Sequence, residues 1–349
     1  MSAGASNVEY VTARVRHRRA ALFGPEEYDT LLRMGPAEIA RFMEETEYDR
    51  EINALGSRHA GVDLIEYALN RNLSRHFDDL LRWADGLLYE QIARYLRKFD
   101  AWNVKTAFRG HYSDATPEEI EDDYIRAGEF DDRFLERLAN AAGIEETVEL
   151  LDPTIFGDAV AAAYPDYEAT GLLVPLENAV DRTYYEGLLA DLPQETDRAT
   201  DLYVEFLQAE IDFRNIRNAF RLARSGADLD PTEYYISGGR LFDANDLRQL
   251  VASSDELVAW LRESAYGPEL SHALDDLEAA DTLIGFEQAL DEALLEYSQH
   301  LAYVFPLSVC PVLAYILAKE REVDNVRAIA RGREAGLSQA EIEEELVML

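Results

Sequence analysis

The stretch KFDAWNVKTAFRG (98–110) decides the fold, because its order of polar residues returns twice later in the chain. Its counterparts are EIDFRNIRNAFRLARSG (210–226) and EREVDNVRAIARG (320–332). In each stretch an acid stands three residues before an asparagine, and an arginine stands six residues after it. We call this pattern the asparagine block. Its residues are Asp100, Asn103 and Arg109; Asp212, Asn215 and Arg221; and Glu322, Asn325 and Arg331.

A second pattern recurs ahead of each asparagine block. IEYALNR (65–71), LENAVDR (176–182) and FEQALDE (286–292) share a glutamate followed two positions later by an alanine. We call this the glutamate block, after Glu66, Glu177 and Glu287. Both blocks recur at intervals of 110 to 112 residues, and the glutamate precedes the asparagine by 37 or 38 residues each time. Two patterns with one period predict a threefold internal repeat.

The segments around the blocks are typical of helices. The glutamate block opens an amphipathic helix, and the asparagine block closes a second helix of about six turns. Thr116 with Glu119, and Ser338 with Glu341, have the spacing of a capping box, which predicts two further helix starts. The sequence has no sustained alternation of apolar and polar residues, so we expect no strands. The sequence therefore predicts an all-α fold of three related helical modules, at residues 1–140 with an N-terminal arm, 141–255 and 256–349.

Acidic residues dominate the charge of the chain. It has 69 Asp and Glu against 33 Lys and Arg, a net charge of −36, and lysine only at positions 98, 105 and 319. Such a chain lacks the basic surface that binds nucleic acid, whereas 48% hydrophobic residues suffice for a folded core. Molar salt screens repulsion between acids over a few ångströms. The composition thus indicates adaptation to a very salty cytoplasm, with an ordinary acidic protein as the alternative.

One uncharged segment needs its own interpretation. LAYVFPLSVCPVLAYILA (301–318) has 18 residues, the lower limit for a membrane-spanning helix. Pro306 and Pro311 would leave backbone groups unpaired in lipid, and Pro311 fits the start of the helix that carries the third asparagine block. We expect either a buried core segment or an apolar docking surface, and the sequence leaves both open. Cys310 is the only cysteine, so no intrachain disulfide is possible.

The repeated polar residues suggest a network between helices. Within one helix the acid and the asparagine of a block point within about 60° of one another, and the basic residue two positions after the asparagine is displaced from them. A glutamate of the same module could complete the network, for example Glu66 with Asn103 and Arg109. Asparagine is a poor helix former, so its recurrence suggests an amide that is hydrogen-bonded across a helix pair. The expected network comprises Glu66, Asn103, Arg109, Glu177, Asn215, Arg221, Glu287, Asn325 and Arg331.

We expect this network to be structural and to fix the register of the helices. The alternative is a triplicated ligand or catalytic site. No other pattern indicates chemistry: there is no phosphate-binding glycine loop, and the six histidines lack metal-ligand spacing. Adjacent acids lack the Asp-Asp-x-x-Asp spacing that would chelate magnesium on one helix face. The sequence therefore predicts no catalytic residue, no metal and no cofactor.

The three pairs of blocks, IEYALNR with NVKTAFRG, LENAVDR with NIRNAFRLARSG, and FEQALDE with NVRAIARG, resemble the C subunit of the archaeal A-type ATP synthase. That family is similar to the d subunit of the eukaryotic V-type ATPase. The resemblance runs from YVTARVR (10–16) to Leu349 and is closest at residues 175–189 and 309–337. The acidic surplus is similar to that of haloarchaeal members.

The resemblance implies a non-catalytic rotor part at the cytoplasmic face of the membrane, without a membrane span. Family members are funnel-shaped, with three helical domains around a pseudo-threefold axis. They stand on the proteolipid (c/K) ring and seat the central stalk, which is formed by the D and F subunits. The chain would thus link ring to stalk and transmit torque between ion translocation and ATP synthesis. Two alternatives stay open: a free-standing acidic helical adaptor, and a metal-dependent all-α enzyme similar in architecture to prenyl-chain enzymes.

Overall fold

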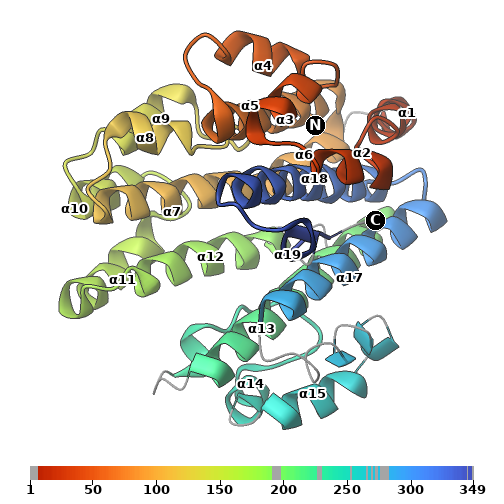
Figure 1. Cartoon of the computed structure of the whole chain (residues 1–349). Coiled ribbons are helices and arrows are strands. Elements are labelled where there is room, and N and C mark those ends of the chain that lie inside the picture. The colour runs from red at the N-terminus through yellow and green to blue at the C-terminus, as the bar shows by residue number, and fades with distance from the viewer. Residues whose placement is uncertain are drawn as a thin grey trace. The chain divides into compact units, whose positions relative to one another are not determined.

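The computed structural model describes residues 7–190, 198–225, 230–251, 254–264, 266–268, 270–271, 274–275, 283–343 and 345–347 (Figure 1). Within these ranges every regular element is a helix, and none is a strand. The all-α fold class expected from the sequence is therefore confirmed.

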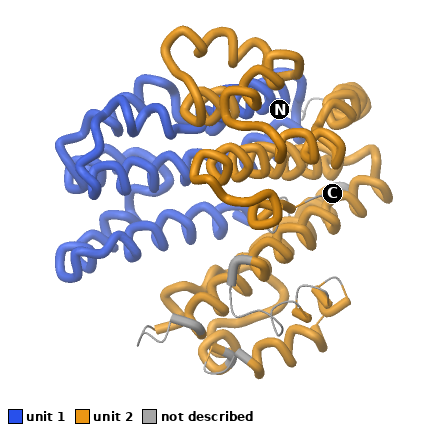
Figure 2. The backbone as a smooth tube through the Cα atoms, in the orientation of Figure 1, with its two compact units in different colours: residues 1–5, 70–192 blue, residues 6–69, 193–349 orange. Residues whose placement is uncertain are grey.

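The described residues form two compact units (Figure 2). The first contains residues 70–190, and the second contains residues 7–69 together with the described residues from 198 onward. The three modules expected at residues 1–140, 141–255 and 256–349 stay a prediction, as does their arrangement around an axis.

The first unit is built around α7 (Lys98–Tyr112), the helix of the first asparagine block. α7 packs against α6, α8, α9, α10 and α12, and it buries Val104, Ala107 and Phe108 together with its polar Asp100 and Asn103. The other helices are α5 (Gly61–Trp83, from residue 70 onward), α6 (Gly86–Leu96), α8 (Pro117–Asp122), α9 (Asp132–Ala139), α10 (Ile144–Leu151), α11 (Gly157–Thr170) and α12 (Val174–Leu189).

In the second unit the other two asparagine blocks lie on α13 (Arg198–Ser225) and α18 (Cys310–Glu334). α13 contributes Phe213, Ile216 and Phe220 to a hydrophobic core cluster, and α18 contacts α1, α2, α3, α17 and α19. The remaining elements are α1 (Val8–Arg19), α2 (Pro25–Leu31), α3 (Pro36–Met43), α4 (Asp49–Leu55), η1 (Pro231–Glu233), α14 (Ala244–Leu250), α15 (Ser254–Arg262), α17 (Leu283–Val304) and α19 (Gln339–Glu343).

Short-range patterns in the sequence predict helix starts correctly. In both expected capping boxes the hydroxyl accepts from the glutamate N–H, and the glutamate carboxylate accepts from the N–H of the hydroxyl residue. Thr116 with Glu119 thus begins α8, and Ser338 with Glu341 begins α19. Pro311 lies in the first turn of α18, as expected, where its missing N–H costs no hydrogen bond.

The uncharged segment 301–318 has two parts. It contains the end of α17, the beginning of α18, and the connection between them, which we call the α17–α18 turn. The α18 part is almost entirely buried, whereas Tyr303 at the end of α17 is 87% exposed and Leu307 in the turn is 64% exposed. The segment is therefore core at one end and exposed apolar surface at the other. No helix in the described ranges is long and apolar enough to cross a membrane.

Candidate functional site

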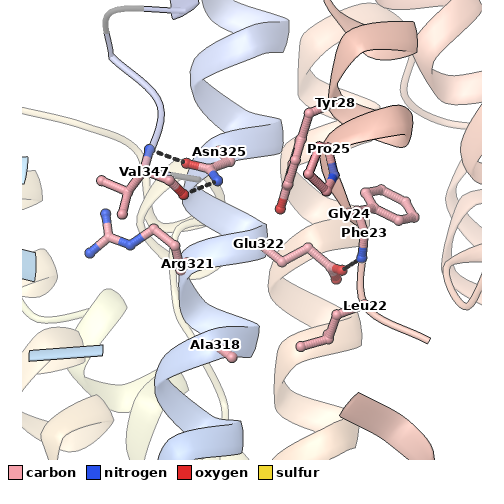
Figure 3. A pocket seen from close by; sticks show the side chains of 10 residues that line it. All are labelled: Leu22, Phe23, Gly24, Pro25, Tyr28, Ala318, Arg321, Glu322, Asn325 and Val347. Atoms are coloured by element: carbon pink, nitrogen blue, oxygen red, sulfur yellow. Dashed lines mark hydrogen bonds between the residues drawn. The ribbon is translucent and has the colours of Figure 1, made fainter. Parts of the chain in front are cut away.

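Each repeated asparagine is buried, and its side chain forms two hydrogen bonds with the backbone of one residue 21 or 22 positions later in the sequence. The side-chain amide donates to the carbonyl of that residue and accepts from its N–H, which satisfies both buried backbone groups. The pairs are Asn103 with Ile125 (2.9 and 2.9 Å), Asn215 with Ile236 (2.8 and 2.9 Å) and Asn325 with Val347 (2.8 and 3.1 Å; Figure 3). We call each pair an asparagine clamp, because it fixes where the following segment returns to the helix.

Asp100 holds the same returning segment at a second point in the first unit. Its carboxylate accepts hydrogen bonds from the N–H groups of Glu129 and Phe130, at 2.8 and 3.0 Å. A Cβ atom on Gly128 would overlap this carboxylate, so the approach requires glycine. Burial raises the pKa of Asp100 to about 6, although the two N–H donors oppose the shift. Asp100 is therefore a buried anchor for the backbone.

Asp212 makes the corresponding contacts in the second unit. Its Oδ1 accepts from the N–H groups of Arg240 and Leu241 at 3.0 and 2.9 Å, and its Oδ2 accepts from the Tyr266 hydroxyl at 3.1 Å. Gly239 again leaves no room for a Cβ atom beside the carboxylate. Burial raises the pKa of Asp212 against the effect of these hydrogen bonds. The second acid thus anchors its returning segment in the same way.

Glu322, the third acid, binds the N-terminal part of the chain. Its Oε2 accepts from the Phe23 N–H and its Oε1 from the Tyr48 hydroxyl, each at 2.6 Å. Lys319 Nζ donates to the same Oε1 at 2.6 Å and to the Tyr48 oxygen at 2.8 Å. The side chains of Lys319 and Glu322 are 1% and 3% exposed. They form a buried ion pair, which is tolerated because further hydrogen bonds satisfy it.

The closing arginines pair with glutamates of the glutamate blocks, and we call each pair an arginine–glutamate clasp. The clasps are Arg109 with Glu177, Arg221 with Glu287, and Arg331 with Glu66. These partners differ from the expected grouping of Glu66 with Asn103 and Arg109. Helical periodicity fixes which side chains share a face, but it does not say which neighbouring helix lies opposite.

A second set of ion pairs, which the sequence analysis does not predict, lies beside the clasps. Lys105 binds Asp181 in the first unit, and Arg217 binds Asp291 in the second. Arg321 also binds Asp291, at 2.8 Å, so one carboxylate joins α13 and α18 to α17. Burial disfavours the ionised form of Asp291, but Arg217 and Arg321 outweigh it and hold the pKa below its ordinary value.

A signal for these pairs is present in the sequence. Each asparagine block has Lys or Arg two positions after its asparagine, and the glutamate blocks have Asn or Asp four positions after their glutamate. Helical periodicity displaces this basic residue from the acid and the asparagine of its own helix. The basic side chain therefore points toward the neighbouring helix, where it binds the Asp of the glutamate block.

The contacts of these residues have the chemistry of a structural network. Among the residues that the structure describes, no three His, Cys, Asp or Glu side chains are placed to hold a metal ion. A cavity of about 70 Å³ lies beside Glu322, lined among others by Tyr28, Arg321 and Asn325 (Figure 3). It has room for a few water molecules. In Figure 3 the Glu322 carboxylate points to the backbone of Phe23, so its charge is directed at the protein itself.

Comparison with known proteins finds relatives along the whole chain. The sequence pattern of the family described as "ATP synthase (C/AC39) subunit" matches residues 11–345. The A-type ATP synthase C subunit of Haloferax volcanii is 68% identical over 346 residues, which cover 99% of both chains. The protein of the same name from Halobacterium salinarum is 59% identical over 350 residues, covering 100% of this chain and 99% of the relative. That of Methanococcoides burtonii is 34% identical over 352 residues, covering 99% and 96%.

Proposed function

The chain belongs to the ATP synthase (C/AC39) subunit family and is thus a subunit of a rotary ATP synthase; from this premise we propose that it is the non-catalytic connector of the rotor. In this proposal it joins the proteolipid (c/K) ring to the central stalk of the D and F subunits at the cytoplasmic face of the membrane. It transmits torque between ion translocation and ATP synthesis. Its three modules form a funnel around a pseudo-threefold axis.

The use of the repeated polar residues carries the proposal. A part that transmits torque needs stiff joints more than it needs reactive groups. The asparagine clamps hold buried backbone groups, and the acids Asp100, Asp212 and Glu322 accept further backbone N–H groups. The arginine–glutamate clasps join neighbouring helices. Satisfied polar networks of this kind make a fold rigid and specific. Their residues are engaged within the protein, which supports a mechanical role.

We assign one partner contact to the α17–α18 turn. Tyr303 and Val304 at the end of α17, and Leu307 in the turn, are exposed large apolar side chains. The chain has no Asp, Glu, Lys or Arg from residue 297 to residue 318. This uncharged run contrasts with the net charge of −36 on the whole chain. Exposed apolar clusters on soluble domains mark sites of protein contact. The proposed occupant is a neighbouring protein of the rotor.

Affinity purification of the tagged protein from gently solubilised membranes in molar salt tests the connector role. We expect the A and B subunits of the headpiece, the D and F subunits of the stalk and the proteolipid to be recovered together. Recovery of the protein alone, or with unrelated soluble proteins, would contradict the proposal and favour the acidic adaptor.

A pair of matched variants tests the docking turn within the same experiment. Leu307→Asp places a charge on the turn, and Leu172→Asp places one on a leucine of similar exposure (56%) in the first unit. We expect Leu307→Asp to lower the yield of partner subunits severalfold and Leu172→Asp to leave it unchanged. Both isolated variants should melt like the wild type. Full recovery of the complex with Leu307→Asp would remove the turn from the interface.

A further inference from the structure

The third acid takes its backbone donor from a distant part of the chain. After the clamped residues Ile125 and Ile236 the chain continues into a glycine turn and further helices, and this turn supplies the N–H groups that Asp100 and Asp212 accept. Glu322 also accepts a backbone N–H, but that group belongs to Phe23, which stands 299 positions earlier in the sequence. The N-terminal segment therefore occupies the place of a returning segment at this acid.

The N-terminal segment shares a local structure with the two returning segments. In all three a Ser or Thr hydroxyl donates to the carbonyl three residues before it and accepts from the N–H of an aromatic residue two positions after it. The turns are Met43, Thr46 and Tyr48 (2.8 and 3.4 Å); Leu151, Thr154 and Phe156 (2.7 and 3.2 Å); and Leu261, Ser264 and Tyr266 (2.7 and 3.2 Å). Turns of this kind are common, so the turn alone is weak evidence of similarity. The stronger evidence is the contact that the aromatic residue makes with an acid.

The aromatic residue of the turn lies at the acid of an asparagine block. The Tyr266 hydroxyl donates to Asp212 at 3.1 Å, and the Tyr48 hydroxyl donates to Glu322 at 2.6 Å. In the remaining turn the residue is Phe156, which has no hydroxyl. The N-terminal turn and that of the second returning segment therefore make the same hydrogen bond to the acid of an asparagine block.

A phenylalanine just before the next helix completes the match. Phe130 precedes the N-cap of α9 and donates its N–H to Asp100, and its ring lies 6.1 Å from that of Phe156. Phe23 precedes the N-cap of α2 and donates its N–H to Glu322, and its ring lies 5.8 Å from that of Tyr48. The N-terminal segment thus makes the same two contacts with Glu322 and Tyr48 as a returning segment makes with its own acid and aromatic residue.

We infer that residues 21–55 are the returning segment of the third asparagine block, so that the third module is assembled from two distant parts of the chain and latched by Glu322. We call residues 21–55 the strap. Within the second unit α2 and α3 of the strap contact α18, and Arg333 donates to the Met34 carbonyl at 3.2 Å. The strap therefore belongs with α18, so residues 21–55 move from the module expected at residues 1–140 to the module at residues 256–349.

The third asparagine block differs from the other two in the donors that its acid accepts from. Asp100 and Asp212 each accept two backbone N–H groups, whereas Glu322 accepts the single N–H of Phe23. The ammonium group of Lys319 supplies an additional donor at this site. Arg97 and Ala209 stand at the corresponding positions of the other two blocks, six residues before the asparagine. Lys319 is thus a specific feature of the closed third module.

The strap is a built-in conformational device. The first two returning segments follow directly from their helices, so their ends stay close to the acid even when the contacts break. The strap is held to α18 by non-covalent contacts alone, and its release separates Phe23 and Tyr48 from Glu322. Opening also exposes the cavity beside Glu322, of which Phe23 and Tyr28 form one wall. This module can therefore open and close while the residues that follow α18 stay in place.

Hydrogen–deuterium exchange of the full-length protein, resolved by peptide, tests the latch. Glu322→Gln removes the charge that holds the strap, and we expect exchange across residues 22–55 to rise at least tenfold. The matched control Asp212→Asn should raise exchange across residues 236–251 and leave residues 22–55 protected. If Glu322→Gln leaves residues 22–55 as protected as in the wild type, or loosens all peptides equally, the inference is wrong.

A milder pair of variants covers the case in which Glu322→Gln fails to fold, since it leaves Lys319 buried without a charged partner. Tyr48→Phe removes the hydroxyl that donates to Glu322 and accepts from Lys319, and Tyr266→Phe removes the corresponding donor to Asp212. We expect a threefold or larger rise of exchange in residues 22–55 for Tyr48→Phe only. An unchanged strap in folded Tyr48→Phe, or an equal response of the strap to Tyr266→Phe, would overturn the inference.

Discussion

Arg331 and Glu66 lie 265 residues apart in the sequence and form a two-point ion pair between α18 and α5, with Arg331 Nη2 2.9 Å from Glu66 Oε2. Each of the other two clasps joins the arginine of one asparagine block to the glutamate of the next glutamate block. The last arginine, Arg331, binds the first glutamate, Glu66. The pairing order is therefore cyclic although the chain is linear, and Glu322 follows the same order when it binds the N-terminal segment.

The clasps should contribute modestly to stability, because their arginines are more than half exposed. Solvent and salt screen such pairs, so each is worth about 0.2 to 1 kcal/mol. We expect Arg109→Ala, Arg221→Ala and Arg331→Ala each to lower Tm by about 1 to 3 °C in molar salt. A double-mutant cycle of Arg221→Ala with Glu287→Ala should return a favourable coupling. Unchanged melting in all three variants would exclude the clasps as joints.

The asparagine clamps should matter more than the clasps, because they are buried. Asn215→Leu leaves the N–H and the carbonyl of Ile236 without their partners. Each unpaired buried group costs about 1 to 3 kcal/mol, so we expect the free energy of unfolding to fall by about 2 to 6 kcal/mol. Asn53→Leu is the matched control on an exposed helix surface and should change it little. Denaturant unfolding measures the free energy of unfolding of both variants. Equal losses would show that the clamp contributes no more to stability than an exposed asparagine.

Asp100 should make stability depend on pH between about pH 4 and pH 7, because burial raises its pKa to about 6. The folded protein then binds a proton in a range where the unfolded chain has lost it. The stability from this group is therefore full at low pH and is lost as pH rises through about 6, by up to about 3 kcal/mol.

Asp100→Asn cannot titrate, so comparison with this variant isolates the effect of Asp100 from that of the other acids. The stability of the wild type relative to Asp100→Asn should decrease as pH rises from 4 to 7 and stay flat above that range. Melting curves at a series of pH values measure it. A constant difference would mean that Asp100 titrates normally in the folded state.

Salt should stabilise the isolated protein, because the chain carries a net charge of −36. Its three lysines fit this adaptation: Lys319 is buried, and Lys98 and Lys105 are half-buried in contacts with Tyr95 and Asp181. Each lysine thus contacts a protein side chain, and none lies on the exposed surface. We expect Tm to fall as salt is reduced below about 1 M, where screening weakens. A Tm independent of salt would contradict the adaptation.

Local signals in the sequence were enough for the helices but not for their partners. The capping boxes of α8 and α19 could be predicted because all their contacts lie within four residues. The repeated asparagines could be identified because asparagine is unfavourable inside a helix, so its recurrence there indicates a specific hydrogen bond. The partner of Arg331 could not be inferred, since nothing local to either residue specifies a pair separated by 265 positions.

The strap shows a different limit of sequence analysis. Its similarity to the returning segments lies in a hydroxyl turn and an aromatic residue, for example Thr46 with Tyr48 against Ser264 with Tyr266. These short signals are separated in the sequence by intervening helices. They became comparable only when the structure placed Tyr48 and Tyr266 at equivalent acids.

The two turn glycines offer a final test of the acid anchors. A Cβ atom on Gly128 would overlap the Asp100 carboxylate, and one on Gly239 would overlap that of Asp212. Neither carboxylate can move aside without losing its backbone N–H donors, so we expect Gly128→Ala and Gly239→Ala each to cost about 1 to 3 kcal/mol. Gly187→Ala is the control: Gly187 lies in α12 with nothing within 4 Å of an added Cβ, and alanine should stabilise the helix by up to about 1 kcal/mol.

The cost at Gly128 should also depend on the carboxylate itself. In an Asp100→Ala background the obstruction is gone, so adding Gly128→Ala should reduce stability far less than it does in the wild type. Denaturant unfolding of the single and double variants gives this coupling directly. Equal costs in the two backgrounds would mean that the glycine is required by the backbone of the turn and that Asp100 does not set the close approach.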